Sequence, residues 1–116
     1  MRRVQSLPSV KAFFLERETL KVRLRETIEE CSARFPEVVE VRVFGSVARG
    51  EETGLSDVDL LVVIREGPDD PLERMRPYFL FFCERIPLSL DVLVVREDEL
   101  HLFEGLYRES RTVTEL

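Results

Sequence analysis

Histidine and cysteine are scarce in this sequence, whose 116 residues include one histidine, His101, and two cysteines, Cys31 and Cys83. A single histidine excludes reaction mechanisms that need two, and we expect His101 to lie on a helix surface. The cysteines are isolated, without a C-x-x-C pair or a Cys/His cluster, which argues against a zinc site. We interpret both as buried thiols of a cytosolic chain.

Long apolar runs are also lacking. No segment approaches the ~20 unbroken apolar residues of a membrane span. Near the N-terminus, charge returns at Lys11, Glu16 and Arg17 before the apolar core of a signal peptide develops. These features predict a cytoplasmic protein without a membrane partner.

An excess of positive charge is absent as well, because the formal net charge is −6. A domain that grips long nucleic acid through its phosphates normally carries a basic face. The composition therefore argues against long nucleic acid as the main partner. It leaves room for a nucleotide, which a few local contacts can hold.

The chain has the composition of a globular protein with a core, at 44% hydrophobic and 34% charged residues. Its length suits one domain over 1–116, with no room for a separate substrate-recognition domain. Hydrophobic periodicity and proline positions predict helices over about 9–35, after Ser46, and over 71–85 and 97–108. They predict strands over 38–44, 57–64 and 88–95, and a short final strand in RTVTEL. The expected fold class is α/β (α+β), with a mixed central sheet flanked by helices and a motif core over about 38–95.

The strand expected over 57–64 is apolar on both faces after its two aspartates, so we place it in the middle of the sheet. Asp57 and Asp59 are two residues apart on this strand and therefore point to one face, roughly 6.5–7 Å apart along the chain. Two like charges beside a buried sheet repel each other, and a divalent cation would compensate them. Solvent-facing residues at a strand end are the alternative interpretation.

Gly45 and Ser46 interrupt the chain between the first strand and a short helix. Glycine lets the backbone turn sharply and lets a ligand approach closely. Ser46 is expected to cap the helix, whose free N–H groups would form an anion site. An ordinary strand-to-helix turn with a capping serine also explains the pair.

Asp91 is a lone aspartate inside the apolar strand LSLDVLVV. A buried carboxylate there is costly unless it is paired or bound to metal. If this strand neighbours the central one, Asp91 lies about 4.8 Å across the ladder from it. The alternative is an ion pair with Arg42 or Arg96.

Together, GSVARGEETGLSDVDLLVV and the later LDVLVV resemble the DNA polymerase beta nucleotidyltransferase superfamily, and within it the minimal nucleotidyltransferase (MNT) proteins. The resemblance covers roughly residues 20–108. It implies that Gly45 and Ser46 hold the terminal phosphates of a nucleotide. It also implies that Asp57 and Asp59 bind two Mg²⁺ ions, and that Asp91 completes the ion nearest the acceptor hydroxyl. Arg49 matches a basic residue frequent after the loop and is expected to touch phosphate, with pairing to Glu51 or Glu52 as the alternative.

The reaction implied is in-line attack of a hydroxyl on the α-phosphate of a nucleoside triphosphate, ATP by expectation, with loss of pyrophosphate. Such a reaction needs positioning and charge neutralisation more than a reactive side chain. The acceptor proton would pass to Asp91 or to water.

The segment PYFLFFCERI, residues 77–86, is apolar on more than one helix face. It is either wedged in the core or exposed as a contact surface for another chain. MNT proteins resembling this one are often paired with a HEPN-domain protein, and some are antitoxins that transfer AMP to a tyrosine of that partner. A HEPN-type partner is therefore implied, and a homo-oligomer is left open.

Three functions remain in competition. The first is an enzyme that transfers AMP from ATP to a hydroxyl of a partner protein. The second is an antitoxin or assembly subunit, weakly catalytic or not catalytic, that acts by covering its partner. The third, modification of a small molecule, usually needs an extra domain to seat the acceptor.

Overall fold

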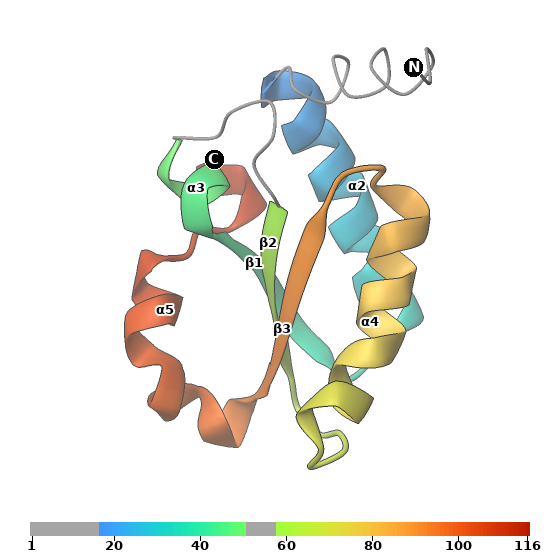
Figure 1. The fold of residues 1–116 in the computed structure, drawn as a ribbon, viewed down its shortest axis with the longest axis vertical. Coiled ribbons are helices and arrows are strands. Elements are labelled where there is room, and N and C mark those ends of the chain that lie inside the picture. Colours follow the sequence, from blue (N-terminus) through green and yellow to red (C-terminus); the bar gives the residue numbers. More distant parts are fainter. Residues whose placement is uncertain (1–16, 51–57) are drawn as a thin grey trace.

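The computed structural model describes residues 17–50 and 58–116 (Figure 1). Three strands and several helical segments alternate along this part of the chain. In order, they are α2 (Arg17–Arg34), β1 (Val38–Phe44), α3 (Gly45–Arg49), β2 (Val58–Ile64), α4 (Pro71–Arg85), β3 (Leu90–Arg96), the 3-10 helix η1 (Glu97–Phe103), α5 (Glu104–Glu109) and the 3-10 helix η2 (Val113–Glu115).

The three strands form one mixed sheet in the order β1-β2-β3. β1 runs antiparallel to β2, whereas β3 runs parallel to it after the crossover through α4. β2 is the middle strand, and its residues from Leu60 to Ile64 are fully buried on both faces. The expected fold class and the central position of this strand are confirmed.

Helices cover the two faces of the sheet unequally. α2 and α4 pack on one face, where they enclose the large core with Val58, Leu60, Val62 and Ile64 (Figure 1). The opposite face carries a smaller core around Leu61, Val63 and Val95, and η1 and α5 cover only this part of it. The rest of that second face is where the candidate site lies.

Two of the expected elements have the bounds that the sequence indicates, β1 and α4. α4 begins sharply because Asp70 caps it, its side chain accepting a hydrogen bond from the Glu73 N–H at 3.2 Å, and Pro71 occupies the first turn. The first helix is described only from Arg17, so its expected start near residue 9 lies outside the described residues.

Other boundaries differ from expectation. β3 runs over Leu90–Arg96 instead of 88–95, because the chain still bends at Leu88 after Pro87. The last helix is divided into η1 and α5, since Phe103 leaves helical geometry at φ −120° and ψ 28°. The final segment forms η2 and one isolated bridge, Val43 to Arg111, instead of a strand.

The cysteines and the histidine occupy different environments. Cys31 is fully buried, and burial raises the pKa of its thiol to about 12, so it is an inert core residue. Cys83 is exposed on α4, which corrects the expectation that both thiols are buried. His101 is exposed on η1, so its expected surface position is confirmed.

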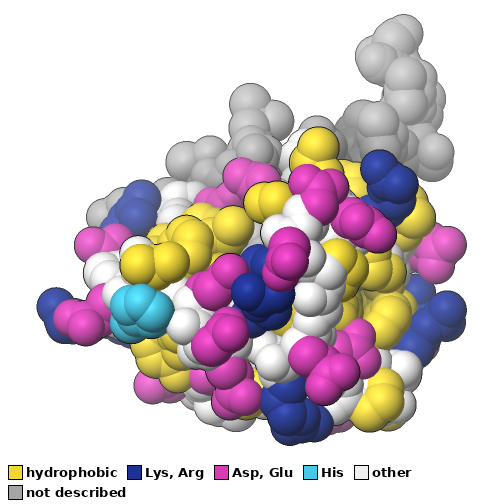
Figure 2. All heavy atoms as spheres, turned by 90° about the horizontal axis from the view of Figure 1, so that it is seen from below, with side chains coloured by type: hydrophobic (Ala, Val, Ile, Leu, Met, Phe, Trp, Pro, Cys, Tyr) yellow, Lys and Arg dark blue, Asp and Glu magenta, His cyan; other side chains and the backbone are white. Residues whose placement is uncertain are grey.

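Charges of both signs mix on the lower end of the molecule, where Figure 2 shows acidic side chains interleaved with basic ones instead of a continuous basic face. Among the described helices, none is long and apolar enough to cross a membrane.

Arg74 of α4 lies at this lower end of the molecule. Its charged side chain is buried, and the residue is only 5% exposed. Its guanidinium donates to Glu99 Oε1 at 2.9 Å, to the carbonyl of Pro68 at 2.8 Å and to that of Asp69 at 3.3 Å. The loop before α4 is thereby tied to η1.

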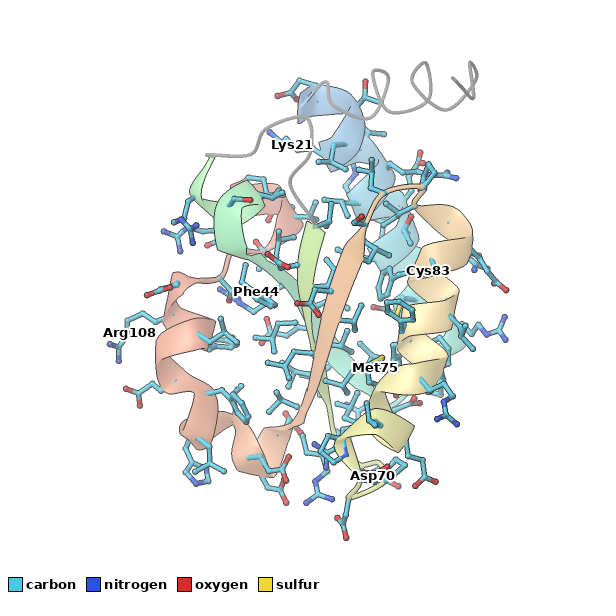
Figure 3. All side chains as sticks on the ribbon, in the orientation of Figure 1. Lys21, Phe44, Asp70, Met75, Cys83 and Arg108 are labelled. Carbon is cyan, nitrogen blue, oxygen red and sulfur yellow. The ribbon has the colours of Figure 1, made fainter. Side chains whose placement is uncertain are left out.

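Substitution Arg74→Met keeps the apolar stem but removes these donors, leaving carbonyl and carboxylate oxygens without partners. We expect the free energy of unfolding to fall by roughly 2–3 kcal/mol in urea titrations. The control is Arg108→Met, which removes an arginine that points to solvent (Figure 3) and forms an exposed ion pair with Glu104. Its expected cost is below about 1 kcal/mol. Equal losses in both variants would contradict the anchoring role of Arg74.

Candidate active site

The turn from β1 into α3 places Gly45 directly against Asp59. Gly45 has φ +73°, a left-handed conformation that glycine adopts without strain. A Cβ atom at this position would lie 2.1 Å from Asp59 Oδ2. The missing side chain of Gly45 therefore makes room for a carboxylate of the protein itself, a role that the sequence alone did not reveal.

Asp59 and Asp91 are register partners on the parallel strands β2 and β3. Neighbouring strands are about 4.8 Å apart, and paired residues point to the same face. On its other side, Asp59 is paired with Phe44 of β1. The sheet thus carries a transverse row of Phe44, Asp59 and Asp91 on the face of the smaller core.

The two carboxylates differ in exposure. Asp59 is half-buried, whereas Asp91 is exposed near the start of β3. Asp91 is therefore not buried, although its place in an apolar strand suggests burial, so no burial cost requires a partner for it. Its alternative, an ion pair with arginine, fails too, because Arg42 binds Glu40 and Ser110 while Arg96 binds Asp69 and Glu99.

Asp57 lies outside the described residues, just before β2. The backbone leading to it is held by the Val58 N–H, which donates to the carbonyl of Ser89 at 2.9 Å. In residues 17–50 and 58–116, no three carboxylate, histidine or cysteine side chains gather as a metal site. The meeting of all three aspartates stays a prediction.

Ser46 does not cap α3 as expected. The helix begins at Gly45, its capping position is Phe44, and no side chain bonds the first N–H groups. Ser46 is the second residue of this single turn and is half-buried. The reason is that Gly45 itself enters the helix, one residue earlier than the motif suggests.

Arg49 is exposed in the last turn of α3, which ends at Gly50 with φ +71°. Its expected alternative partners, Glu51 and Glu52, lie outside the described residues. α3 is anchored by Val47, which is buried in the large core. Gly45, Ser46 and Arg49 are therefore carried by one short, firmly seated turn.

A polar cluster that sequence reasoning missed supports β1 beside the site, on the same face of the sheet. The guanidinium of Arg42 lies 4.2 Å from the centroid of the Tyr107 ring and donates to Ser110 Oγ at 2.5 Å. Tyr107 donates to Glu40 Oε2 at 2.6 Å, and this hydrogen bond raises the pKa of its phenol. Arg42 is two residues before Phe44, so the cluster fixes the end of β1 that leads to Gly45. Figure 3 shows Phe44 on the side of the sheet that faces α5.

Comparisons with known proteins identify the family of the chain and relatives of its fold. A family model described as a nucleotidyltransferase domain matches residues 24–115. The chain is 29% identical over 92 residues to a candidate protein adenylyltransferase of Methanocaldococcus jannaschii, in a match covering 76% of this chain and 63% of that relative's length.

A crystal structure of a candidate nucleotidyltransferase from Sulfolobus solfataricus superposes with a TM-score of 0.59 at 23% identity. The superposition covers 95% of this chain and 87% of that one, and it shows a shared fold. Since the family model spans most of the chain, from α2 to η2 and across Gly45, Asp59 and Asp91, the protein belongs to the nucleotidyltransferase domain family.

Proposed function

We propose that this protein transfers a nucleoside monophosphate, AMP from ATP, to a hydroxyl of a partner protein. The observation that carries the proposal is the carboxylate of Asp59, seated against the Cα of Gly45 and aligned across the ladder with Asp91. Membership of the nucleotidyltransferase family supports the reaction class. The name of the Methanocaldococcus relative supports adenylyl transfer to a protein.

The donor set of this row suits magnesium. Mg²⁺ prefers oxygen ligands and is commonly held by one or two carboxylates together with substrate phosphates. Asp59 and Asp91 supply two carboxylates on one face, and Asp57 would supply a third. Two bound Mg²⁺ ions would neutralise the triphosphate and lower the pKa of the acceptor hydroxyl.

The residues of the chain divide the remaining work. Ser46 donates its hydroxyl to the terminal phosphates, and Arg49, exposed on the same turn, adds positive charge beside them. Asp57, Asp59 and Asp91 would hold the ions and so orient the bound triphosphate toward the acceptor.

The acceptor oxygen forms a new bond to this phosphorus while the bond to the bridging oxygen breaks, and pyrophosphate leaves with the bonding electrons. Asp91 is assigned to the acceptor side by the resemblance to the MNT proteins, and its exposure on β3 is compatible with this role. The acceptor proton passes to Asp91 or to water.

A protein acceptor fits the charge of the molecule better than long nucleic acid does. The chain carries a formal charge of −6, and its lower end mixes charges of both signs (Figure 2). We propose a HEPN-domain protein as the partner and an antitoxin role for the transfer.

Labelled ATP distinguishes this proposal from its rivals. With Mg²⁺ and a HEPN-domain protein of the same organism, label from the α-phosphate is expected on the partner, and label from the γ-phosphate is not. Chelation of Mg²⁺ should abolish the transfer.

Absence of α-label on the partner, or transfer of the γ-label, would reject the proposal. If the Asp59→Asn variant binds and neutralises the partner as well as the wild type does, the protein acts by covering its partner instead.

A further inference from the structure

α4 carries an exposed stripe that the candidate site does not use. Leu72, Arg76, Leu80 and Glu84 follow one another at intervals of four residues, so they lie along one side of the helix. Leu72 is 64% exposed and Leu80 is 55% exposed, although neighbouring Phe81 and Phe82 are buried in the large core. The segment 77–86 is thus a core helix that also presents an apolar surface.

A hollow of about 310 Å³ adjoins Leu80, between the end of α2 and α4. Its apolar lining comes from Phe35, Pro77, Leu80 and Phe81, and Arg34 and Glu84 supply one charge of each sign. A hollow of this size beside an exposed leucine accepts an apolar side chain from outside.

The charges on the stripe specify what approaches it. Arg76 is one turn before Leu80 and has no ion pair within the described part of the chain, whereas Glu84 is one turn after Leu80. Within the described part of the chain, the ion pair of Glu84 is with its neighbour Arg85, at 3.3 Å, an exposed pair of little energetic value. The order along the stripe is therefore positive, apolar, negative.

This order is complementary to itself when two such helices pack antiparallel about Leu80. A twofold axis at Leu80 brings the two leucines together and places Arg76 of each copy beside Glu84 of the other, forming two ion pairs. We propose that α4 is the dimerisation surface of this protein and that its occupant is α4 of a second copy.

The position of α4 in the fold allows such a dimer to function. α4 packs on the face of the sheet opposite to Asp59 and Asp91, because its Phe82 lies in the large core with Leu60 and Val62. Both candidate sites therefore stay open to nucleotide and acceptor. The inference does not rest on the proposed reaction.

The contact is small. α4 has 15 residues and is about 22 Å long, so one helix pair with its flanks lies at the low end of specific interfaces. We therefore expect reversible dimerisation with a dissociation constant in the micromolar range, about 1–100 µM.

Sedimentation velocity over about 1–200 µM tests the proposal. The wild type is expected to rise from 13.6 kDa toward twice that mass, and Leu80→Glu is expected to stay monomeric.

Arg76→Glu and Glu84→Arg should each raise the dissociation constant about tenfold or more, because like charges then face each other twice. The double variant, Arg76→Glu with Glu84→Arg, should return to within about threefold of the wild type, since both pairs form again with reversed sign. Arg108→Glu makes the same charge change on α5 and should have no effect.

Crosslinking gives a second readout. With Cys83→Ser to remove the exposed native thiol, Leu80→Cys is expected to form a disulfide between copies on mild oxidation. Leu102→Cys, at a 69% exposed leucine on η1, should not. Circular dichroism and urea titrations verify that each variant is folded.

A wild type that remains monomeric up to about 200 µM would overturn the proposal. This holds even if α4 then binds a protein of different sequence. A dimer that survives Leu80→Glu would also overturn it, as would a double charge reversal that fails to restore what the single reversals lose.

Discussion

Asp59→Asn is expected to lower kcat/KM for nucleotidyl transfer by about 10³-fold or more, because the amide no longer supplies the charge that holds a divalent ion. Asp59 is the central member of the row on the sheet, between Phe44 and Asp91. The substitution leaves the size of the side chain nearly unchanged, and circular dichroism and urea titrations verify that the variant is folded.

The measurement is transfer of α-labelled phosphate at saturating Mg²⁺, together with the shift of the thermal midpoint on adding Mg²⁺ and nucleotide. Asp98→Asn is the matched control, since Asp98 is an exposed aspartate on η1 that pairs with Arg96. It should keep both activity and the midpoint shift. Full activity in Asp59→Asn would show that Asp59 does not belong to the site. If Asp59→Asn does not fold, Mg²⁺ binding by the Asp91→Asn variant becomes the deciding measurement.

Gly45→Ala and Gly50→Ala form a matched pair with a large expected difference. Both glycines have left-handed backbone, φ +73° and φ +71°, so alanine costs about 1–2 kcal/mol of folding free energy at either position. At Gly45 the new Cβ meets a side chain, Asp59 Oδ2 at 2.1 Å, whereas at Gly50 it meets no atom of the described residues within 4 Å. Gly45→Ala must therefore displace the carboxylate.

Displacement by about 1 Å can cost on the order of 10²-fold in rate, and we expect at least this loss of kcat/KM in Gly45→Ala. Gly50→Ala should be destabilised to a similar degree in urea and retain activity within a few-fold of the wild type. Similar activities in the two variants would show that the contact between Gly45 and Asp59 has no role in positioning.

Much of the fold follows from local patterns. β1 is bounded correctly because Val41 and Val43 alternate with Arg42 and are buried, although Val39 is exposed beside a register shift at the start of the strand. α4 is bounded correctly because Asp70, Pro71 and Pro87 mark its ends. The adjacency of Asp59 and Asp91 follows from two apolar strands joined by one helix, an arrangement that makes them parallel neighbours.

The rest depends on contacts between distant residues. The exposure of Asp91 depends on how far η1 and α5 extend over the sheet. The apolar sequence of the strand around Asp91 gives no information on that extent. The seat of Asp59 against Gly45 is a tertiary contact, and Arg42 reaches Ser110 across 68 positions of sequence. The wrong prediction that Ser46 caps α3 has a local cause. The motif shows that the chain turns at Gly45, but it does not show that the helix already includes this glycine.

The close fit between Gly45 and Asp59 also couples the substitutions that the family can accept at these two positions. A relative that keeps the aspartate has no room for a methyl group at the glycine position, because the carboxylate already occupies that space. In a relative without this carboxylate the steric obstacle is gone, and only the left-handed backbone still favours glycine at the turn. Relatives with another residue at the position of Gly45 should therefore be those that lack catalytic activity and act as binding proteins.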